Sequence, residues 1–299
     1  MTGEKLNKGT AVALGNFDGM HIGHSAVLDK TIELSEKDLT PTVMLFDEHS
    51  LKAVKGEAPP MIMTEDERLS FLKSKGLSAV TVNFTDIKDY TPTEFVECIL
   101  KEKLKARAVV CGFNYRFGKG AAGDASLLGA LCESNGIECV VIEEVFSDSL
   151  PVNSTAIRKA IESGDMVRAN KMLGRRFSFT ATVIDGDKRG RTWGFPTINQ
   201  RLPDGMVTPR FGVYKSAVKI GREYYTGVTN IGYRPTVGTD TVLCETHILG
   251  FSGNLYGRDI EISLIDFIRP EKKFSSFDEL VSQIKSDCIL VKGGVTEDV

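Results

Sequence analysis

Short hydrophobic runs alternate with amphipathic stretches through the first half of the chain. Apolar runs of strand length occur at 11–14, 42–46, 79–84, 108–111 and 138–142. Stretches with helical spacing lie between them, at 22–34, 65–75, 93–105 and 124–135. Strands that alternate with helices in this way are typical of a parallel sheet covered by helices. The pattern therefore predicts an α/β domain.

The pattern changes near residue 174. Residues 154–173 indicate two short helices, with a break at Ser163-Gly164-Asp165 and a stop at Leu173-Gly174. Strand-like runs then follow one another directly, at 177–184, 211–219, 223–229, 241–250 and 259–267. A final amphipathic helix is expected at 274–289. Closure of these strands into a small antiparallel barrel would remove exposed sheet edges. We therefore predict two domains, 1–174 and 175–299.

Composition narrows the class of protein. The 299 residues exceed the usual size of a single core, and 41% hydrophobic residues are enough for two. A formal charge of −3 with mixed signs argues against a broad nucleic-acid surface. No signal-peptide core or run of about 20 apolar residues is present, which argues against a membrane partner. Six cysteines without a CxxC pair favour free thiols in a reducing cytoplasm. We expect a cytoplasmic protein that acts on small molecules, with its oligomeric state left open.

Two of the four histidines close the segment Gly15-Asn16-Phe17-Asp18-Gly19-Met20-His21-Ile22-Gly23-His24. An apolar run precedes it and a helical pattern follows, so it is expected to be a strand, a glycine turn and a helix start. The glycines allow a sharp turn and close approach to a ligand, and free amides at a helix start attract anions. His21 and His24 would lie on one side of the first turn, where both could donate hydrogen bonds to a phosphate. The alternative is a solvated polar turn.

This segment resembles the signature of the HxGH nucleotidylyltransferases, in the version found in bacterial bifunctional riboflavin kinase/FAD synthetases. Asn153-Ser154-Thr155-Ala156-Ile157-Arg158 is similar to the Ser-Ser-Thr-x-x-Arg segment of that family. The resemblance implies that His21, His24 and Arg158 are catalytic, and that Ser154 and Thr155 lie near the ATP phosphates. It also implies a nucleotide-binding role for the turn, with Gly15, Asn16, Phe17, Asp18, Gly19 and Gly23.

A third segment, Gly112-Phe113-Asn114-Tyr115-Arg116-Phe117-Gly118, resembles the Gly-x-Asp-Phe-Arg-Phe-Gly segment of the family. The resemblance places it at the flavin and nucleotide site, with Asn114 and Arg116 as binding residues. Asn114 replaces an aspartate, which removes a charge, and Tyr115 replaces a phenylalanine. For Phe117, direct ligand contact and packing on the sheet remain alternatives.

The clearest departure from the family is Phe46-Asp47-Glu48-His49-Ser50, where Phe-x-Pro-His-Pro is usual. Proline fixes φ and restrains the residue before it, so the loss of both prolines changes the constraints on this loop. The role of His49 in flavin handling is therefore open between a site residue and an exposed loop histidine.

The second half contains a segment similar to the riboflavin kinase signature, Gly186-Asp187-Lys188-Arg189-Gly190-Arg191-Thr192-Trp193-Gly194-Phe195-Pro196-Thr197-Ile198-Asn199. Glycines with a basic cluster suit a loop that wraps ATP phosphates, and Thr197 and Asn199 offer neutral oxygen ligands to Mg²⁺. The binding residues implied are Gly186, Lys188, Gly190, Arg191, Thr192, Thr197 and Asn199. A solvated basic turn is the alternative for Lys188, Arg189 and Arg191.

Glu245 is the candidate general base of this second site. Cys244-Glu245-Thr246-His247-Ile248-Leu249 alternates as a strand does, so Glu245 and His247 would share one face. A carboxylate there could take the proton of the riboflavin 5′-hydroxyl as it attacks ATP, and the family uses the glutamate of its Glu-x-His segment in this way. We expect His247 to support the site structurally. Further matches lie at 211–214, 230–236 and 254–258.

The resemblance implies a Rossmann-like α/β nucleotidyltransferase of the HxGH type with a parallel sheet, followed by a small antiparallel β-barrel riboflavin kinase domain with a C-terminal helix. It implies a bifunctional enzyme that phosphorylates riboflavin to FMN and then transfers AMP from ATP to FMN, giving FAD and pyrophosphate, with Mg²⁺ as cofactor. Two alternatives remain: mainly a riboflavin kinase with a weakened adenylyltransferase domain, or a module that only binds flavin or nucleotide.

Overall fold

The computed structural model describes residues 9–36, 38–47, 56–186, 194–236, 239–292 and 295, with the backbone alone at 234–236, 239 and 240. The chain forms two compact units, and each is built around its own large sheet. The first unit comprises residues 1–59 and 65–153, and the second comprises 60–64 and 154–299. His49 and the segment 187–193, which includes Lys188, Gly190, Arg191 and Thr192, lie outside the described residues.

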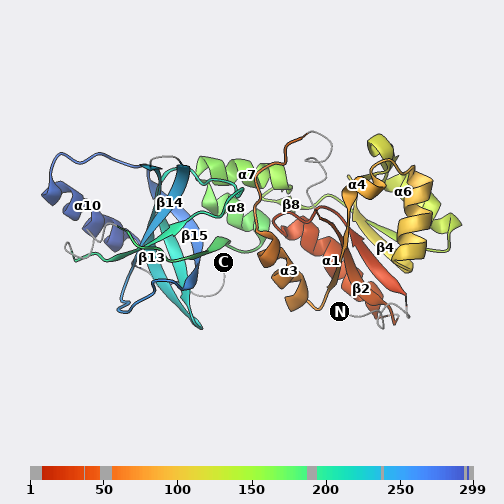
Figure 1. Cartoon of the computed structure of the whole chain (residues 1–299), viewed down its shortest axis with the longest axis horizontal. Helices are drawn as coiled ribbons and strands as arrows, with labels where there is room; N and C mark the ends of the chain where they lie inside the picture. The colour runs from red at the N-terminus through yellow and green to blue at the C-terminus, as the bar shows by residue number, and fades with distance from the viewer. Residues whose placement is uncertain are drawn as a thin grey trace. The chain divides into compact units, whose positions relative to one another are not determined.

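The first unit contains a parallel sheet of five strands in the order β3-β2-β1-β4-β7 (Figure 1). Its strands are β1 (Thr10–Leu14), β2 (Thr40–Phe46), β3 (Ser78–Val82), β4 (Ala106–Gly112) and β7 (Glu138–Ile142). The five strands expected from the apolar runs are thus confirmed. The chain moves outward from β1 to β3 on one side and then from β4 to β7 on the other. The strand order therefore reverses between β1 and β4, and such a switch point is where open α/β sheets bind ligands.

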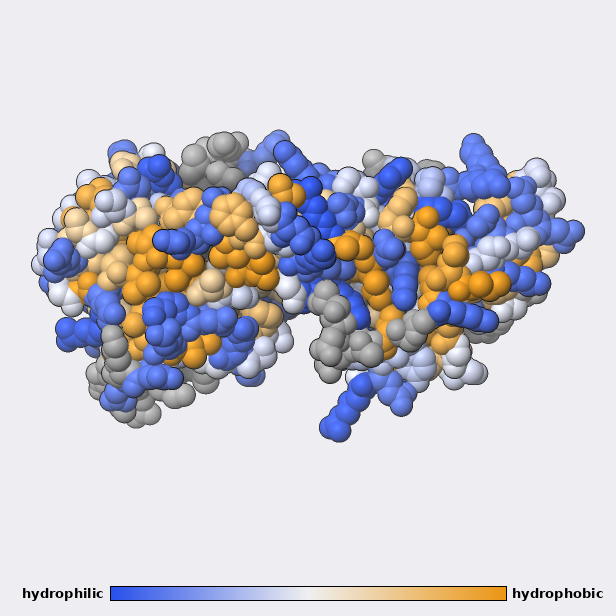
Figure 2. All heavy atoms as spheres, turned by 180° about the vertical axis from the view of Figure 1, so that it is seen from behind, coloured by the Kyte–Doolittle hydropathy of each residue, from blue (hydrophilic) through white to orange (hydrophobic). Residues whose placement is uncertain are grey.

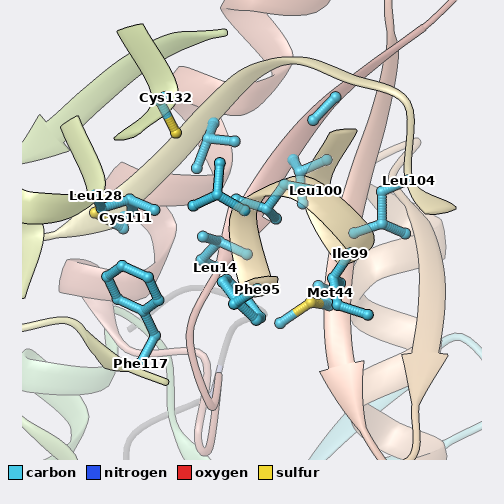
Figure 3. Packing of buried hydrophobic residues seen from close by; sticks show 14 of the residues in the cluster. Leu14, Met44, Phe95, Ile99, Leu100, Leu104, Cys111, Phe117, Leu128 and Cys132 are labelled. Carbon is cyan, nitrogen blue, oxygen red and sulfur yellow. The ribbon is translucent and has the colours of Figure 1, made fainter. Parts of the chain in front are cut away.

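Helices cover both faces of this sheet. β1 is buried on both faces of the sheet. Its larger side chains, Val12 and Leu14, point to one face, and its smaller ones, Ala11 and Ala13, point to the other. The larger side chains join a core with η2 (Phe95–Lys103), a π-helix, and α6 (Ala125–Ser134) (Figure 3). Helix α1 (Ile22–Ser35) packs against β1, β2 and β4. The small residues let that helix approach the sheet closely, so its first turn lies near the end of β1.

Shorter elements complete the first unit. They are α3 (Glu65–Ser74), α4 (Phe84–Ile87), α5 (Pro92–Glu94), β5 (Arg116–Phe117), η3 (Lys119–Ala121), β6 (Gly123–Asp124), β8 (Phe146–Ser147) and β9 (Leu150–Pro151). α5 begins with a capping box, in which Thr91 accepts from the Glu94 amide and the Glu94 carboxylate accepts from the Thr91 amide. α5 and η2 together form the helix expected over 93–105.

The second unit contains an antiparallel sheet of six strands in the order β10-β15-β12-β13-β14-β11 (Figure 1). The elements are β10 (Phe177–Thr182), β11 (Thr197–Arg201), β12 (Gly212–Ile220), β13 (Glu223–Thr236), β14 (Thr239–Ile248), β15 (Asp259–Arg269) and α10 (Phe277–Leu290). The chain beyond β10 meets β11 through an antiparallel bridge between Ile184 and Asn199. This bridge brings the two edges of the sheet together, so the barrel-like closure expected from the sequence is confirmed.

Two contacts fix the shape of the barrel. Gln200 of β11 is fully buried, and its amide donates to the backbone oxygens of Ala181 in β10 and Ile260 in β15. On the outside, α10 is held to β15 by Arg269 and Asp287, whose nearest oxygen and nitrogen lie 2.7 Å apart. The expected C-terminal helix is thus confirmed and attached to the sheet.

Helices α7 (Ser154–Ser163) and α8 (Met166–Leu173) belong to the second compact unit. The break between them at Gly164 is the one expected. The side-chain amide of Asn170 in α8 donates to the Leu264 backbone oxygen and accepts from the Phe177 amide. The compact units divide after Asn153, and the domain boundary after residue 174 that the sequence pattern indicates stays a prediction. Packing against β10 and β15 is the physical reason why α8 lies in the second compact unit.

The surface of both units is mixed. Figure 2 shows, on the face that it presents, hydrophobic residues among hydrophilic ones on both units. Exposed large apolar side chains include Phe146, Ile289 and Leu290. Such exposure is ordinary, because polar residues are too few to cover a globular protein. Within the described residues, every helix is too short or too polar to cross a membrane. All six cysteines are free thiols.

Candidate active sites

The first candidate site lies at the carboxyl ends of β1 and β4, where the strand order reverses. The turn that starts at Gly15 follows β1, and the segment that starts at Gly112 ends β4. The two strands pair in parallel, with Leu14 opposite Cys111. Two segments that are far apart in the sequence therefore leave the sheet side by side, at the place where α/β sheets bind ligands.

The turn after β1 has an unusual backbone. Phe17, Gly19 and Met20 have positive φ values of 50°, 79° and 43°. A bulky residue in this region costs on the order of 1–3 kcal/mol, and such strain persists only where the surroundings enforce it. The side chains of Phe17 and Met20 are almost fully buried, which supplies that enforcement. The turn is thus held in one conformation and directs the next residue, His21.

His21 and His24 lie on the first turn of α1 with their rings stacked. Their ring centroids are 3.6 Å apart and the planes differ by 16°. His21 is the N-cap of the helix, and its Nδ1 accepts from the His24 amide at 3.2 Å. Because Nδ1 of His21 accepts, a neutral ring carries its proton on Nε2. The amides of Ile22 and Gly23 have no acceptor within the helix, as at any helix start.

The surroundings of His24 favour its neutral form. Burial, and secondly the neighbouring His21, lower the pKa of His24 well below its usual range. Its Nδ1 is buried and lacks a hydrogen-bond partner among the described residues. Phe17 packs against the ring, with centroids 5.2 Å apart. A buried, unsatisfied ring nitrogen is costly unless a ligand or water satisfies it, so it is a mark of a binding site.

Gly23 is the residue that allows this ring arrangement. A β-carbon at position 23 would lie 3.2 Å from both Cε1 and Nδ1 of His21. That separation is shorter than the usual 3.5–4.0 Å between carbon atoms. The glycine between the two histidines therefore makes room for the His21 ring.

Arg68 is a neighbour of the turn that the sequence did not indicate. Its Nη1 donates to the backbone oxygen of Asn16 at 3.3 Å, from helix α3. Its Nε is buried without a hydrogen-bond partner among the described residues. No motif surrounds Arg68, so only the fold brings it to the site.

The segment after β4 divides between surface and core. Asn114 and Arg116 are exposed, and an Arg116 nitrogen lies 3.9 Å from an Asp124 oxygen. Phe117 is buried, and its ring packs against Phe95 with centroids 5.3 Å apart. Of the two alternatives for Phe117, the structure shows core packing. The ligand roles of Asn114 and Arg116 stay predictions.

Ser154, Thr155 and Arg158 lie at the start of α7, in the second compact unit. Arg158 Nε donates to the Pro60 backbone oxygen at 2.7 Å. The side chain is therefore held in place by the segment 60–64, which belongs to the same unit. The phosphate-binding roles implied for these three residues stay predictions.

The second candidate site lies on the outer face of β11 and β14. These strands are antiparallel, with Thr197 opposite His247 and Asn199 opposite Glu245. Directly opposite residues share a face, with β-carbons about 4.5–5.5 Å apart. The register therefore brings together the four residues that the sequence singled out. Thr246 points the other way, where buried hydroxyls of Ser216, Thr229 and Thr246 are linked at 2.7 and 2.9 Å.

Asn199 has the features of a ligand residue. It is 5% exposed, and its Oδ1 is buried without a hydrogen-bond partner among the described residues. A β-carbon at Gly186 would overlap the Asn199 amide, so only glycine allows the chain to pass there. An amide oxygen beside a threonine and a glutamate provides the hard oxygen donors that Mg²⁺ prefers. The residues present therefore fit a magnesium ion.

His247 supports the strand that carries these ligands. Its Nδ1 lies 2.8 Å from the Pro196 backbone oxygen, and its ring packs edge-on against Phe195 at 5.4 Å. Because Pro196 immediately precedes Thr197, this contact fixes the start of β11. The structural role expected for His247 agrees with this placement.

Comparison with known proteins assigns both halves of the chain. The FAD synthetase family matches residues 3–156 and the riboflavin kinase family matches residues 173–293. The bifunctional riboflavin kinase/FMN adenylyltransferases of Listeria monocytogenes and Haemophilus influenzae are each 34% identical to the chain. These matches cover 94% and 95% of this chain and 90% and 93% of the relatives.

A solved structure that covers both units is similar to this chain. It is the crystal structure of a Streptococcus pneumoniae protein named as a macrolide-efflux protein, with a TM-score of 0.88 and 30% identity. The match covers 97% of this chain and 95% of that one. Since both family patterns are present in order and the relatives match over nearly their whole lengths, this chain belongs to the bifunctional riboflavin kinase/FMN adenylyltransferase family.

Proposed function

We propose that the second unit phosphorylates riboflavin with ATP, giving FMN, and that the first unit transfers AMP from ATP to FMN, giving FAD and pyrophosphate. The observation that carries the proposal is the stacked pair His21 and His24 on the first turn of α1, at the strand-order switch. The imidazoles and the first backbone amides of α1 both offer hydrogen-bond donors where an anionic ligand is expected to bind.

In AMP transfer, an oxygen of the FMN phosphate attacks the α-phosphorus of ATP. The new oxygen–phosphorus bond forms as the bond to the β-phosphate oxygen breaks, and pyrophosphate leaves with that electron pair. The attacking phosphate is already an anion, so no general base is needed. The protein supplies alignment and charge stabilisation. The Nε2–H of His21 and the first amides of α1 are suitable donors.

In riboflavin phosphorylation, the 5′-hydroxyl oxygen attacks the γ-phosphorus of ATP, and ADP leaves. Glu245 takes the hydroxyl proton, which requires it to be ionised and within hydrogen-bond reach. Thr197 and Asn199 would hold Mg²⁺, which when bound would neutralise phosphate charge. The buried, unpartnered Oδ1 of Asn199 supports this assignment.

A second candidate is a protein that is mainly a riboflavin kinase. The observation that favours it is the absence of both family prolines from Phe46-Asp47-Glu48-His49-Ser50. Proline limits the conformations of a loop, so their loss would weaken flavin positioning for AMP transfer.

The test is a chromatographic assay of the full chain with riboflavin, ATP and Mg²⁺, in which FMN, FAD and pyrophosphate are followed over time. We expect FMN to form first and FAD with pyrophosphate to follow. FMN alone would favour the kinase-only candidate. Neither product from folded protein, together with flavin binding by calorimetry, would replace both candidates with a binding module.

A further inference from the structure

A row of polar side chains extends the second site beyond the residues described above. Glu245 in β14 is directly opposite Asn199 in β11 and also directly opposite Asn230 in β13. Such pairs lie on one face with β-carbons about 4.5–5.5 Å apart. The carboxylate of Glu245 is therefore flanked by a carboxamide on each side. Asn199 offers an oxygen ligand for Mg²⁺, whereas none of the roles described above involves Asn230.

Asn230 is held from its other side by Glu271. The Asn230 Nδ2 donates to Glu271 Oε1 at 3.4 Å. Glu271 follows β15, and Arg269, two residues before it, is bonded to Asp287 and donates to the Pro270 backbone oxygen at 3.1 Å. The segment that carries Glu271 is thus anchored to both β15 and α10.

Gly232 makes the approach of Glu271 possible. It lies two residues after Asn230 on the same strand and hence on the same face. A β-carbon at position 232 would overlap Glu271 Oε1. A side chain there would push the carboxylate away from Asn230. The glycine and the glutamate are therefore parts of one arrangement.

We propose that Asn230, held by Glu271 over Gly232, is a positioning residue for Glu245 in riboflavin phosphorylation. The inference rests on the proposed kinase function and on Glu245 as its base. A carboxamide nitrogen carries two hydrogens. Asn230 gives one to Glu271 and the other to Glu245. The amide thereby separates two carboxylates and holds Glu245 in the orientation in which it accepts the hydroxyl proton.

The test compares the kinetics of FMN formation by the full chain in N230A, E271A, E271Q and G232A. We expect N230A to lower kcat about tenfold or more while KM for ATP stays within twofold, because alignment of the base is lost and nucleotide binding is kept. E271A should lower kcat less, and E271Q should restore most of it, because the glutamine oxygen still accepts from Asn230.

G232A supplies a test that does not remove any polar group. It should lower kcat as E271A does, and the double variant G232A/E271A should be no slower than E271A alone, because both changes break one contact. Lys272 is next to Glu271 and pairs with Glu279 at 2.7 Å. K272A is the matched control and should leave kcat within twofold. Circular dichroism in urea, with the parent protein as the reference, checks that the kinase unit of each variant is folded, because FAD formation depends on the other unit.

Several results would overturn the inference. N230A with kcat within twofold of the parent would do so, as would a raised KM for riboflavin with unchanged kcat, which indicates ligand contact instead. Fully additive losses in G232A and E271A would refute the shared contact. If the parent protein formed no FMN, or if E245Q kept full activity, the kinase function or its base would be wrong instead, and the two failures are thus distinguishable.

Discussion

The glycine between the two histidines allows a sharp test of the first site, through Gly23→Ala. The added methyl would lie 3.2 Å from two atoms of the His21 ring. To reach ordinary contact, the ring must move by roughly 0.3 Å or more. Displacements of about 1 Å at a catalytic group cost about 100-fold in rate. A smaller shift, with a weakened stack on His24, should lower kcat for FAD formation about tenfold.

Folding should not suffer from this change. Gly23 is in the first turn of α1, where alanine favours the helix over glycine by up to about 1 kcal/mol. We therefore expect an unchanged or higher free energy of unfolding together with lower FAD formation. FMN formation, measured in the same reaction with riboflavin and ATP, should be unchanged because its site lies in the other unit.

Gly129→Ala is the matched control. Gly129 is inside α6, and a β-carbon there would meet nothing within 4 Å. It should raise stability by a similar amount and leave both reactions unchanged. Denaturant titrations and the chromatographic assay measure the two effects. FAD formation by Gly23→Ala within twofold of the parent would refute the argument that the His21 ring must stay where it is.

Three further predictions concern the two candidate sites and the contact between Arg269 and Asp287. His24→Ala should abolish FAD formation from FMN and spare FMN formation, while Glu245→Gln should do the reverse when FMN is supplied; loss of both products in either variant would contradict separate sites. The lowered pKa of His24 means that the unfolded chain binds a proton that the folded chain does not. The free energy of unfolding should therefore fall as pH drops below about 6.5, by at most about 1.4 kcal/mol per pH unit, and His24→Ala should flatten this dependence in denaturant titrations at several pH values. Asp287→Ala should destabilise the protein by about 3 kcal/mol, because it leaves Arg269 partly buried without its partner; a loss below 1 kcal/mol in the same titrations would show that the pair contributes little.

The periodicity of the sequence predicted most of the fold. Each strand of the parallel sheet coincides with an apolar run. The central strands β1, β2 and β4 are mostly buried and therefore consist largely of hydrophobic residues, whereas the edge strands β3 and β7 are only partly buried. β11 was not predicted, because Asn199 and Gln200 make it look like a polar loop. Gln200 is nevertheless buried, since its amide bonds to β10 and β15. Those partners are distant in the sequence, so no local pattern could indicate that burial.

The two candidate sites differ in how far their residues lie apart in the sequence, and therefore in how much of each site could be predicted. His21 and His24 are three residues apart on one helix, so their proximity could be predicted from spacing alone. Their stacking and the strained turn could not, because both depend on buried Phe17 and Met20. In the second site, the alignment of Glu245 with Asn230 depends on strand register. A shift of one residue would place them on opposite faces, and only the folded sheet determines the register.

The boundary between the folding units can be tested by a pair of fragments. We propose that the second unit begins at Ser154, because α8 is built into it. Asn170 satisfies the buried Leu264 oxygen and Phe177 amide, and Met166 and Leu173 are almost fully buried. Residues 157–172 lie between the two family matches, so neither family model assigns them to a domain.

A fragment of residues 154–299 should unfold cooperatively, and a fragment of residues 175–299 should have a much lower denaturation midpoint. The shorter fragment exposes the apolar surface that α8 covered, at roughly 1.5–3 kcal/mol for each buried side chain, and leaves two backbone groups without partners. Both fragments lack residues 60–64, and the loss of the Arg158–Pro60 contact affects only the longer fragment, so it works against the expected difference. Circular dichroism in urea measures the midpoints. Equal midpoints would place the boundary after residue 174, where the sequence pattern changes. A large difference would mean that α7 and α8 help to keep the kinase barrel folded. This would hold even though α7 begins with Ser154 and Thr155, which are expected to serve AMP transfer.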